Sequence, residues 1–204
     1  MRRRTLWIAL VVLLVAGAGV YGVVLIHHGF SARDEPSTLE AWTARRVRRL
    51  AIPADAKDLK NPVQRSPDGL REGMQHFADH CAMCHANDGS GNTEIGRNLY
   101  PKAPDMRAAQ TQNLTDGEIY YIIQNGIRLS GMPAWGKAGD PNDEESWNLV
   151  YFIRHLPSLT SEEEQQMKQW NPVSPSEVES DKEEEEFLEG GVAKPPSQKH
   201  SQPK

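Results

Sequence analysis

The chain has 204 residues, with 23 basic and 28 acidic side chains and a formal net charge of −5. This balance leaves no basic surplus for binding a nucleic acid, so we expect no nucleic-acid partner. The charges are spread unevenly. Residues 1–65 hold 11 Lys or Arg against 5 Asp or Glu, residues 66–158 hold 7 against 12, and residues 159–204 hold 5 against 11.

A long apolar segment follows the basic start at residues 1–4. Residues 6–26 carry no charged side chain, and a helix of this length crosses the roughly 30 Å hydrocarbon core of a bilayer. A cleaved signal peptide is the alternative, but its apolar region is normally only about 7 to 15 residues long. We expect an uncleaved single-pass anchor at residues 5–27, with membrane lipid around it. Arg2, Arg3 and Arg4 favour the cytoplasmic side, which places the rest of the chain on the periplasmic or extracellular side of a bacterial inner membrane.

Residues 28–65 read as a connector that contains one short amphipathic helix. Leu39, Trp42 and Arg46 fall on one helical row, and Ser37 or Thr38 can cap the helix. Its basic cluster, residues 45–49, could lie against anionic lipid, or the helix could be a solvated spacer. Prolines at positions 53, 62 and 67 predict an extended path after it, which could wrap the domain surface.

The pattern CxxCH occurs once, as Cys81, Ala82, Met83, Cys84 and His85. This spacing is typical of covalently attached c-type haem, in which two thiols bind the porphyrin edge and the histidine ligates the iron. A disulfide between the two cysteines is an alternative, but it leaves His85 without a role. A zinc site is another, but the chain has no second CxxC and no second histidine cluster with ligand spacing. We therefore expect one covalent haem c.

Three helices are predicted around this motif, in a domain at residues 66–158. Leu70, Met74 and Phe77 give the first helix, over residues 70–80, an apolar face. A capping box at Thr115 and Glu118 begins the second helix, and Gly126 is placed to end it. Asn142 or Asp143 begins the third, over residues 147–156, and Pro157 ends it. No segment alternates like a strand, so the fold class is all-α.

Met132 is the candidate for the second axial position of the iron. It lies between Gly131 and Pro133, which predict a loop from which a thioether can point inward. Met1, Met74 and Met83 are excluded by their positions, which leaves Met106 and Met167 as competitors. Ligation by histidine and methionine is typical of cytochromes c. Arg128 or Trp135 could bind a haem propionate, although both could equally be surface residues.

A short helix at residues 159–170 and an acidic disordered tail at residues 171–204 are predicted after the domain. The helix has acidic residues in its first turn. The tail has four prolines, the acidic run at residues 183–186 and few large apolar residues. The simplest interpretation is that this acidic tail is solvated. The alternative is that the tail docks on a basic partner.

Residues 66–158 resemble a small monohaem class I cytochrome c of the kind found in cbb3-type oxidase subunits and alcohol dehydrogenase cytochromes. The resemblance rests on the first helix, CAMCH, LTDGEIYYIIQNGI, GMPAWG and the closing helix, in that order. It implies that the first and last helices cross, with Gly73 and Phe77 meeting Tyr151. It also implies that a proline carbonyl holds the proximal histidine, and Pro101 and Pro104 both remain open. Ala86 departs from the glycine that many relatives carry.

The resulting hypothesis is a membrane-tethered monohaem cytochrome c, bound through Cys81, Cys84, His85 and Met132, that passes single electrons between redox protein partners. We expect no bond-making catalysis and no small organic substrate, because both axial positions of the iron are filled. One alternative is an open-site gas sensor or peroxidase-like protein, should Met132 not ligate. The other is a cytochrome subunit of a larger oxidoreductase complex.

Overall fold

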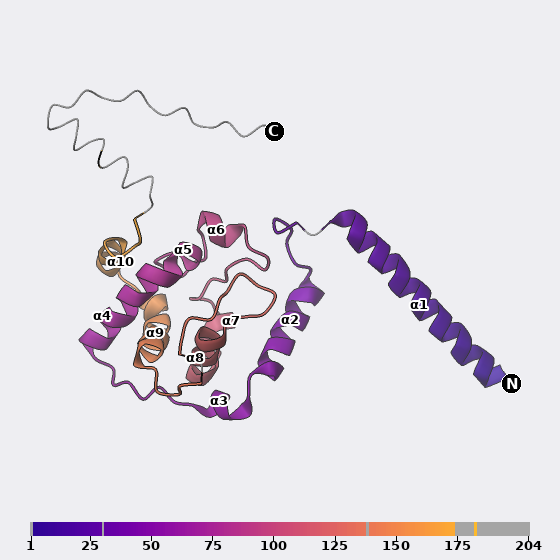
Figure 1. Ribbon diagram of the computed structural model, residues 1–204, viewed down its shortest axis with the longest axis horizontal. Helices are drawn as coiled ribbons and strands as arrows, with labels where there is room; N and C mark the ends of the chain where they lie inside the picture. Colours follow the sequence, from indigo (N-terminus) through magenta and orange to yellow (C-terminus); the bar gives the residue numbers. More distant parts are fainter. Residues whose placement is uncertain (1, 30, 138, 174–181, 183–204) are drawn as a thin grey trace, which may run out of the picture.

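The computed structural model describes residues 2–29, 31–137, 139–173 and 182, and these contain helices and no strands. The predicted all-α class is therefore confirmed over this part of the chain (Figure 1). The helices are α1 Arg2–His28, α2 Thr38–Ala51, α3 Ala54–Asp58, α4 Pro67–His76, α5 Ala82–His85, α6 Glu94–Arg97, α7 Ala109–Gln112, α8 Asp116–Asn125, α9 Glu144–His155 and α10 Ser161–Lys168.

The crossing of α4 and α9 forms the centre of the domain. A Cβ atom added to Gly73 would overlap the carbonyl group of Asn148, so only glycine allows this close approach of the two backbones. Next to it, the fully buried rings of Phe77 and Phe152 pack edge to face, with centroids 5.0 Å apart. The crossing of the first and last helices is thus present, but its partners are Asn148 and Phe152.

Tyr151, which the resemblance implied as the partner, is half-buried, and the guanidinium carbon of Arg65 lies 5.9 Å from its ring centroid. The α9 side chain that packs on Phe77 and lies 3.0 Å from a Cβ atom placed on Gly73 is that of the next residue, Phe152. Apolar residues cover most of the circumference of α9, so their periodicity does not show which of them contacts α4. That contact depends on how α4 and α8 both pack against α9.

The predicted first helix changes its geometry before the CxxCH motif. The α-helical hydrogen bonds of α4 end at His76, and a π-helical turn, Phe77–Cys81, connects it to α5. The wider turn lets the adjacent side chains of Phe77 and Ala78 both become fully buried. π-Helical turns of this kind often mark functional sites.

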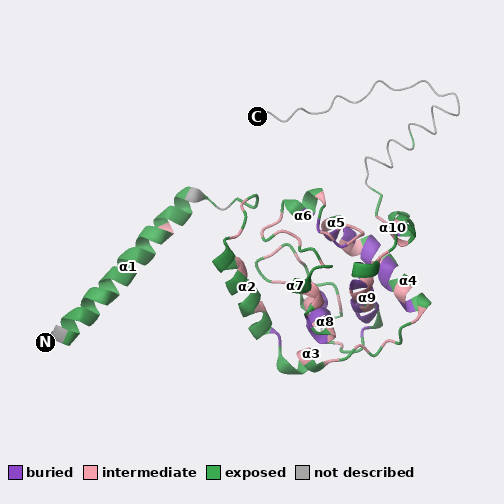
Figure 2. Ribbon diagram, turned by 180° about the vertical axis from the view of Figure 1, so that it is seen from behind, coloured by how far each residue is buried: buried purple, intermediate pink, exposed green. Residues whose placement is uncertain are grey.

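Helix α8 begins and ends where its cap residues predict. Thr115 and Glu118 exchange the two hydrogen bonds of a capping box, and Gly126 ends the helix with φ +63°. The Tyr120 ring stacks on that of Trp147 from α9, with centroids 4.0 Å apart. Figure 2 shows the resulting buried centre, formed mainly by α4, α8 and α9.

The connector wraps the domain, as predicted, although it is not extended throughout. Ser37 caps α2, and the short helix α3 packs against α8, where a Cβ atom on Gly117 would overlap the carbonyl of Ala56. Asn61 then donates a hydrogen bond of 2.9 Å to the carbonyl of Trp147. The connector therefore adds contacts to α8 and α9.

Helix α1 contains the apolar stretch Arg3–His27, which is long enough to span a membrane. Its described side chains are almost all exposed. At the other end, α10 has a capping box at Thr160 and Glu163 and covers the core with the fully buried Met167. Most of the predicted acidic tail, residues 174–181 and 183–204, lies outside the described residues.

Candidate haem site

The CxxCH residues occupy the end of the π-helical turn and all of α5. Cys81 is the last residue of the turn, whereas Cys84 and His85 are the last two residues of α5. Both cysteines are free, so the alternative disulfide is not formed. Burial, reinforced by the neighbouring Cys84, raises the pKa of the Cys81 thiol to about 12. Burial also raises the pKa of Cys84. The raised pKa values favour the protonated thiol form of both side chains at neutral pH.

The His85 side chain is buried, with 8% of its surface exposed. Its ring lies beside Phe77, with centroids 6.4 Å apart. Burial lowers the pKa of His85, and the backbone of Pro104 opposes this effect as a hydrogen-bonding group. Nδ1 is nevertheless buried without a partner that meets hydrogen-bond geometry. The ring is therefore neutral at pH 7, which is the form that ligates a metal.

The loop after α5 brings Pro104 close to this histidine. The amide of Gly91 donates to the carbonyl of His85 at 2.8 Å, which folds the loop back. A Cβ atom on Gly91 would lie 3.2 Å from the carbonyl oxygen of Pro104. Of the two prolines that the sequence left open, the structure favours Pro104, because a metal-bound histidine normally donates its other ring N–H to such an acceptor.

Met132 lies in the loop between α8 and α9 and is half-buried. Its carbonyl accepts a hydrogen bond of 3.0 Å from the amide of Ile127, which closes the loop at its base. A Cβ atom on Gly131 would lie 2.6 Å from the side chain of Leu99, so this loop packs against the segment that follows α6. The two competitors are placed elsewhere: Met167 is a fully buried residue of α10, and Met106 packs against the core cluster.

Trp135 connects the Met132 loop to the CxxCH segment. Its indole ring meets the imidazole of His80 edge to face, with centroids 5.2 Å apart. His80 directly precedes Cys81 in the chain. The structure thus brings the GMPAWG loop next to the start of the haem motif. The sequence analysis considered Trp135 as a propionate ligand or as a surface residue, and nothing in the spacing of His80 and Trp135 indicated their contact.

A buried polar network supports the same loop from below, and the sequence analysis missed it. One carboxylate oxygen of Asp143 accepts hydrogen bonds from Ser146 at 2.7 Å, Gln124 at 2.8 Å and the amide of Lys137 at 3.3 Å. The amide of Trp135 donates to the carbonyl of Ile123 at 3.0 Å. The end of the loop is therefore fixed to both α8 and α9.

These residues fit a covalent haem. The two thiols are free, the buried histidine ring is neutral, and the thioether of Met132 belongs to a loop that lies against the same segment. A haem between them would bond to the thiols of Cys81 and Cys84, with His85 and Met132 as the two iron ligands, the donor set of cytochromes c.

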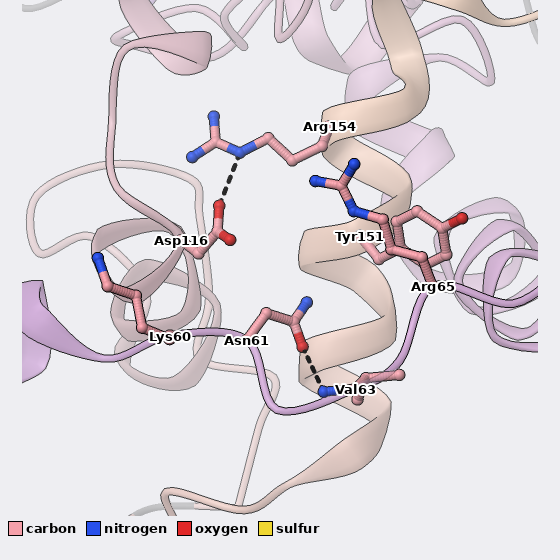
Figure 3. A pocket seen from close by; sticks show the side chains of 7 residues that line it. All are labelled: Lys60, Asn61, Val63, Arg65, Asp116, Tyr151 and Arg154. Atoms are coloured by element: carbon pink, nitrogen blue, oxygen red, sulfur yellow. Dashed lines mark hydrogen bonds and ion pairs between the residues drawn. The ribbon is translucent and has the colours of Figure 1, made fainter.

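A separate pocket of about 180 Å³ lies between the connector, α8 and α9 (Figure 3). Figure 3 shows Arg154 directed at Asp116, and their ion pair measures 2.8 Å. Arg154 also donates to the carbonyls of Gln112 and Leu114, which makes it a structural link between elements. The residues that line this pocket include none of the four expected haem-binding residues.

Comparisons with known proteins match the same part of the chain. Residues 68–153 match the family described as cytochrome C oxidase, cbb3-type, subunit III. The cbb3-type cytochrome c oxidase subunit FixP of Sinorhizobium medicae (strain WSM419) is 37% identical over 92 residues, which cover 44% of this chain and 28% of that protein. Subunit FixPc of Rhizobium leguminosarum bv. viciae is 38% identical over 94 residues, which cover 45% of this chain and 29% of that protein. The chain thus spans less than a third of the length of these curated relatives.

Proposed function

We propose that this membrane-anchored protein carries single electrons between redox proteins. The premise is that residues 68–153 form a cbb3-like class I c-type cytochrome domain. Domains of this family bind haem c, and the chain has one CxxCH motif for it. The observation that carries the proposal is the pairing of a buried, neutral His85 with a methionine loop that lies against the CxxCH segment. This arrangement supports a single haem with both axial positions filled.

Each residue of the site has a role in this proposal. Cys81 and Cys84 attach the porphyrin edge, which keeps the cofactor in place during repeated turnover. His85 would ligate the iron through its ring nitrogen, and the carbonyl of Pro104 would orient that ring. Met132 would supply a thioether as the other protein ligand and would keep small ligands away from the metal. The haem itself supplies an iron that changes between the ferrous and ferric states, with a potential raised by thioether ligation.

The position of the haem domain relative to the membrane is also part of the proposal. Arg2, Arg3 and Arg4 precede the uncharged run at residues 6–26, and an excess of Lys and Arg near a first membrane helix favours the cytoplasmic side. The domain then lies on the periplasmic or extracellular face. Accessibility of an introduced cysteine to a membrane-impermeant thiol reagent in intact cells tests this orientation.

The ferric absorption spectrum of the haem-loaded full chain tests the site. We expect a methionine-to-iron charge-transfer band in the wild type and its loss in Met132→Ala, with a change to high-spin iron. Met106→Leu is the matched control, because Met106 is the half-buried competitor, and it should retain the band. A high-spin wild type, or a band that persists in Met132→Ala, would contradict the proposal and favour an open-site sensor or peroxidase-like protein.

A second candidate function is that of a cytochrome subunit in a larger complex. It is favoured by the names of the matched relatives, which are subunits of cbb3-type cytochrome c oxidases. Gentle detergent extraction followed by size-exclusion chromatography separates the two candidates. Stoichiometric comigration with oxidase subunits supports the complex, whereas a haem-containing species of the size of this chain alone supports a free carrier.

A further inference from the structure

Helix α2 carries four large apolar side chains that are exposed. The exposed fraction is 58% for both Trp42 and Val47, 72% for Leu39 and 77% for Leu50. No residue of α2 is buried. Single exposed apolar side chains are normal on protein surfaces, but four on a helix of 14 residues indicate a surface that contacts something apolar.

The same helix forms one wall of a pocket rich in arginine. The pocket has a volume of about 290 Å³ and is lined by Trp42, Arg45, Arg46, Arg48, Arg49, Ala109, Gln110, Asn113 and Leu114. Four of these residues carry a guanidinium group. Trp42 and Arg46 are both exposed and lie one turn apart, so they connect the pocket to the outward face of the helix.

The charges of this pocket are only partly balanced by protein groups. Arg49 pairs with the buried carboxylate of Glu118 at 3.4 Å, and the other oxygen of that carboxylate accepts the amide of Thr115 at 2.8 Å. Nε of Arg48 is buried and has no hydrogen-bond partner. Burial is the main cause that lowers the pKa of Arg48; the carboxylate of Glu118 opposes it, and the neighbouring Arg45 and Arg49 add to the lowering. A buried guanidinium donor without an acceptor costs free energy, which an anion placed in the pocket would recover.

The position of α2 in the chain identifies the source of the anion. Nine residues separate the end of α1 at His28 from the start of α2 at Thr38. Even a fully extended chain of this length spans only about 30 Å, so α2 stays close to the bilayer that holds α1. Glu35 and Glu40 pair with Lys102 and Tyr100 of the haem domain, which fixes this segment to the domain. Figure 1 shows α2 at the edge of the domain nearest to α1.

We propose that the arginine pocket of α2 binds the phosphate of an anionic phospholipid, while Leu39, Val47 and Leu50 enter the interfacial region of the same bilayer. The guanidinium group of arginine can donate two parallel hydrogen bonds to phosphate oxygens. Amphipathic helices with basic residues beside their apolar face lie in the plane of anionic membranes, with the apolar face buried in the interface. The contact goes beyond electron carriage, because it determines which face of the haem domain lies on the membrane and which face remains open to redox partners.

The test uses the haem-loaded full chain in nanodiscs. The native cysteines hold the haem, so a cysteine introduced as Leu50→Cys can be spin-labelled selectively. In nanodiscs that contain phosphatidylglycerol, we expect the label to be more accessible to oxygen than to a water-soluble nickel complex, and in phosphatidylcholine alone we expect the reverse. Val173→Cys, on an exposed apolar residue at the other end of the domain, should remain in water in both lipids.

The contribution of the pocket is tested with Arg45→Gln combined with Arg46→Gln. Each basic residue near an anionic surface contributes about fivefold to binding, so the pair should shift the equilibrium of the label toward water by about 25-fold. Lys60→Gln with Arg71→Gln removes the same charge from exposed positions outside α2 and should have no effect. Three results would overturn the proposal: a label in water in both lipids, equal immersion in both lipids, or immersion only after a purified redox partner is added.

Discussion

His80 and Trp135 hold the two halves of the candidate haem site together. Their rings meet at an interplanar angle of 78°, with centroids 5.2 Å apart, although 55 positions separate them in the chain. His80 immediately precedes the first haem-binding cysteine, and Trp135 follows Met132 by three residues. A contact between these residues therefore couples the position of the methionine loop to that of the CxxCH segment.

Trp135→Ala is expected to weaken methionine ligation without unfolding the domain. An edge-to-face aromatic pair contributes about 0.5 to 1.5 kcal/mol beyond area burial, which corresponds to roughly a two- to tenfold shift between ligated and detached loops. The charge-transfer band should disappear at a lower temperature than in the wild type, well before helicity is lost in far-UV circular dichroism. Trp135→Phe keeps an aromatic edge and should retain most of the band. Identical melting of the band in the alanine variant and the wild type would show that the contact does not support the loop.

Asp143→Asn is expected to destabilise the loop from its other end. The Asp143 side chain is 4% exposed. Burial acts to raise its pKa, but hydrogen bonds from Ser146, Lys137 and Gln124 outweigh it, and the net pKa lies below its usual value. Such a carboxylate contributes stability above the unfolded-state pKa of roughly 3.9, and this stability is lost as the pH falls through the folded-state pKa.

At pH 7, Asp143→Asn should lower the free energy of unfolding by about 1 to 3 kcal/mol. The difference from the wild type should shrink below about pH 4, because the wild-type carboxylate then becomes protonated as well. Urea unfolding of the haem-loaded chain at several pH values measures this. Glu145→Gln, on an exposed carboxylate in the first turn of α9, should change the free energy of unfolding at pH 7 by less than about 0.5 kcal/mol. If the free energy of unfolding of Asp143→Asn stayed below that of the wild type by the same amount down to pH 2, the negative charge of Asp143 would not be the source of its stabilising effect.

Local signals explain why much of the fold could be predicted. Ser37, Thr115 and Gly126 cap helices through hydrogen bonds and dihedral angles that involve only their chain neighbours. Such interactions are encoded within a few residues, so the pattern identifies them. The CxxCH motif is local in the same sense, because its function depends on the spacing of three side chains.

The rest depends on contacts between distant segments. Which residue of α9 meets Gly73 is set by the simultaneous packing of α4 and α8, so Tyr151 was predicted where Asn148 and Phe152 occur. The choice between Pro101 and Pro104 required the path of the loop around His85. The sequence left open whether the basic cluster of α2 lies against lipid or in solvent, and it did not indicate that Arg49 pairs with Glu118, 69 positions away.

Gly73→Ala is expected to destabilise the haem-loaded protein by about 1 to 3 kcal/mol. The added methyl group would overlap the backbone of Asn148, and a backbone in the middle of a helix cannot move aside without separating α4 from α9. Guanidinium unfolding followed by circular dichroism measures the change. Gln75→Ala, on the exposed side of the same helix, should change stability by less than about 0.5 kcal/mol. Equal stability of Gly73→Ala and the wild type would mean that the two helices are farther apart than described.

Ala86→Gly is expected to stabilise the protein. Ala86 directly follows His85 and has φ +59° and ψ +157°, a region that is essentially restricted to glycine. The strain explains why glycine is expected at this position in the family. Its relief, less the larger backbone entropy of glycine in the unfolded chain, should raise the free energy of unfolding by about 1 kcal/mol.

Ala108→Gly is the matched control for this change. Ala108 has the same ψ as Ala86, +157°, but its φ is −74°, and its side chain is exposed. Ala108 is the N-cap of α7, where glycine is favoured over alanine, and this offsets the unfolded-state cost of glycine, so the same substitution should change stability by less than about 0.5 kcal/mol. A gain at Ala86 that clearly exceeds the change at Ala108 in guanidinium unfolding would attribute that gain to the backbone beside His85. Destabilisation by both would contradict a strained conformation at Ala86, because the cost of the glycine would then exceed any relief.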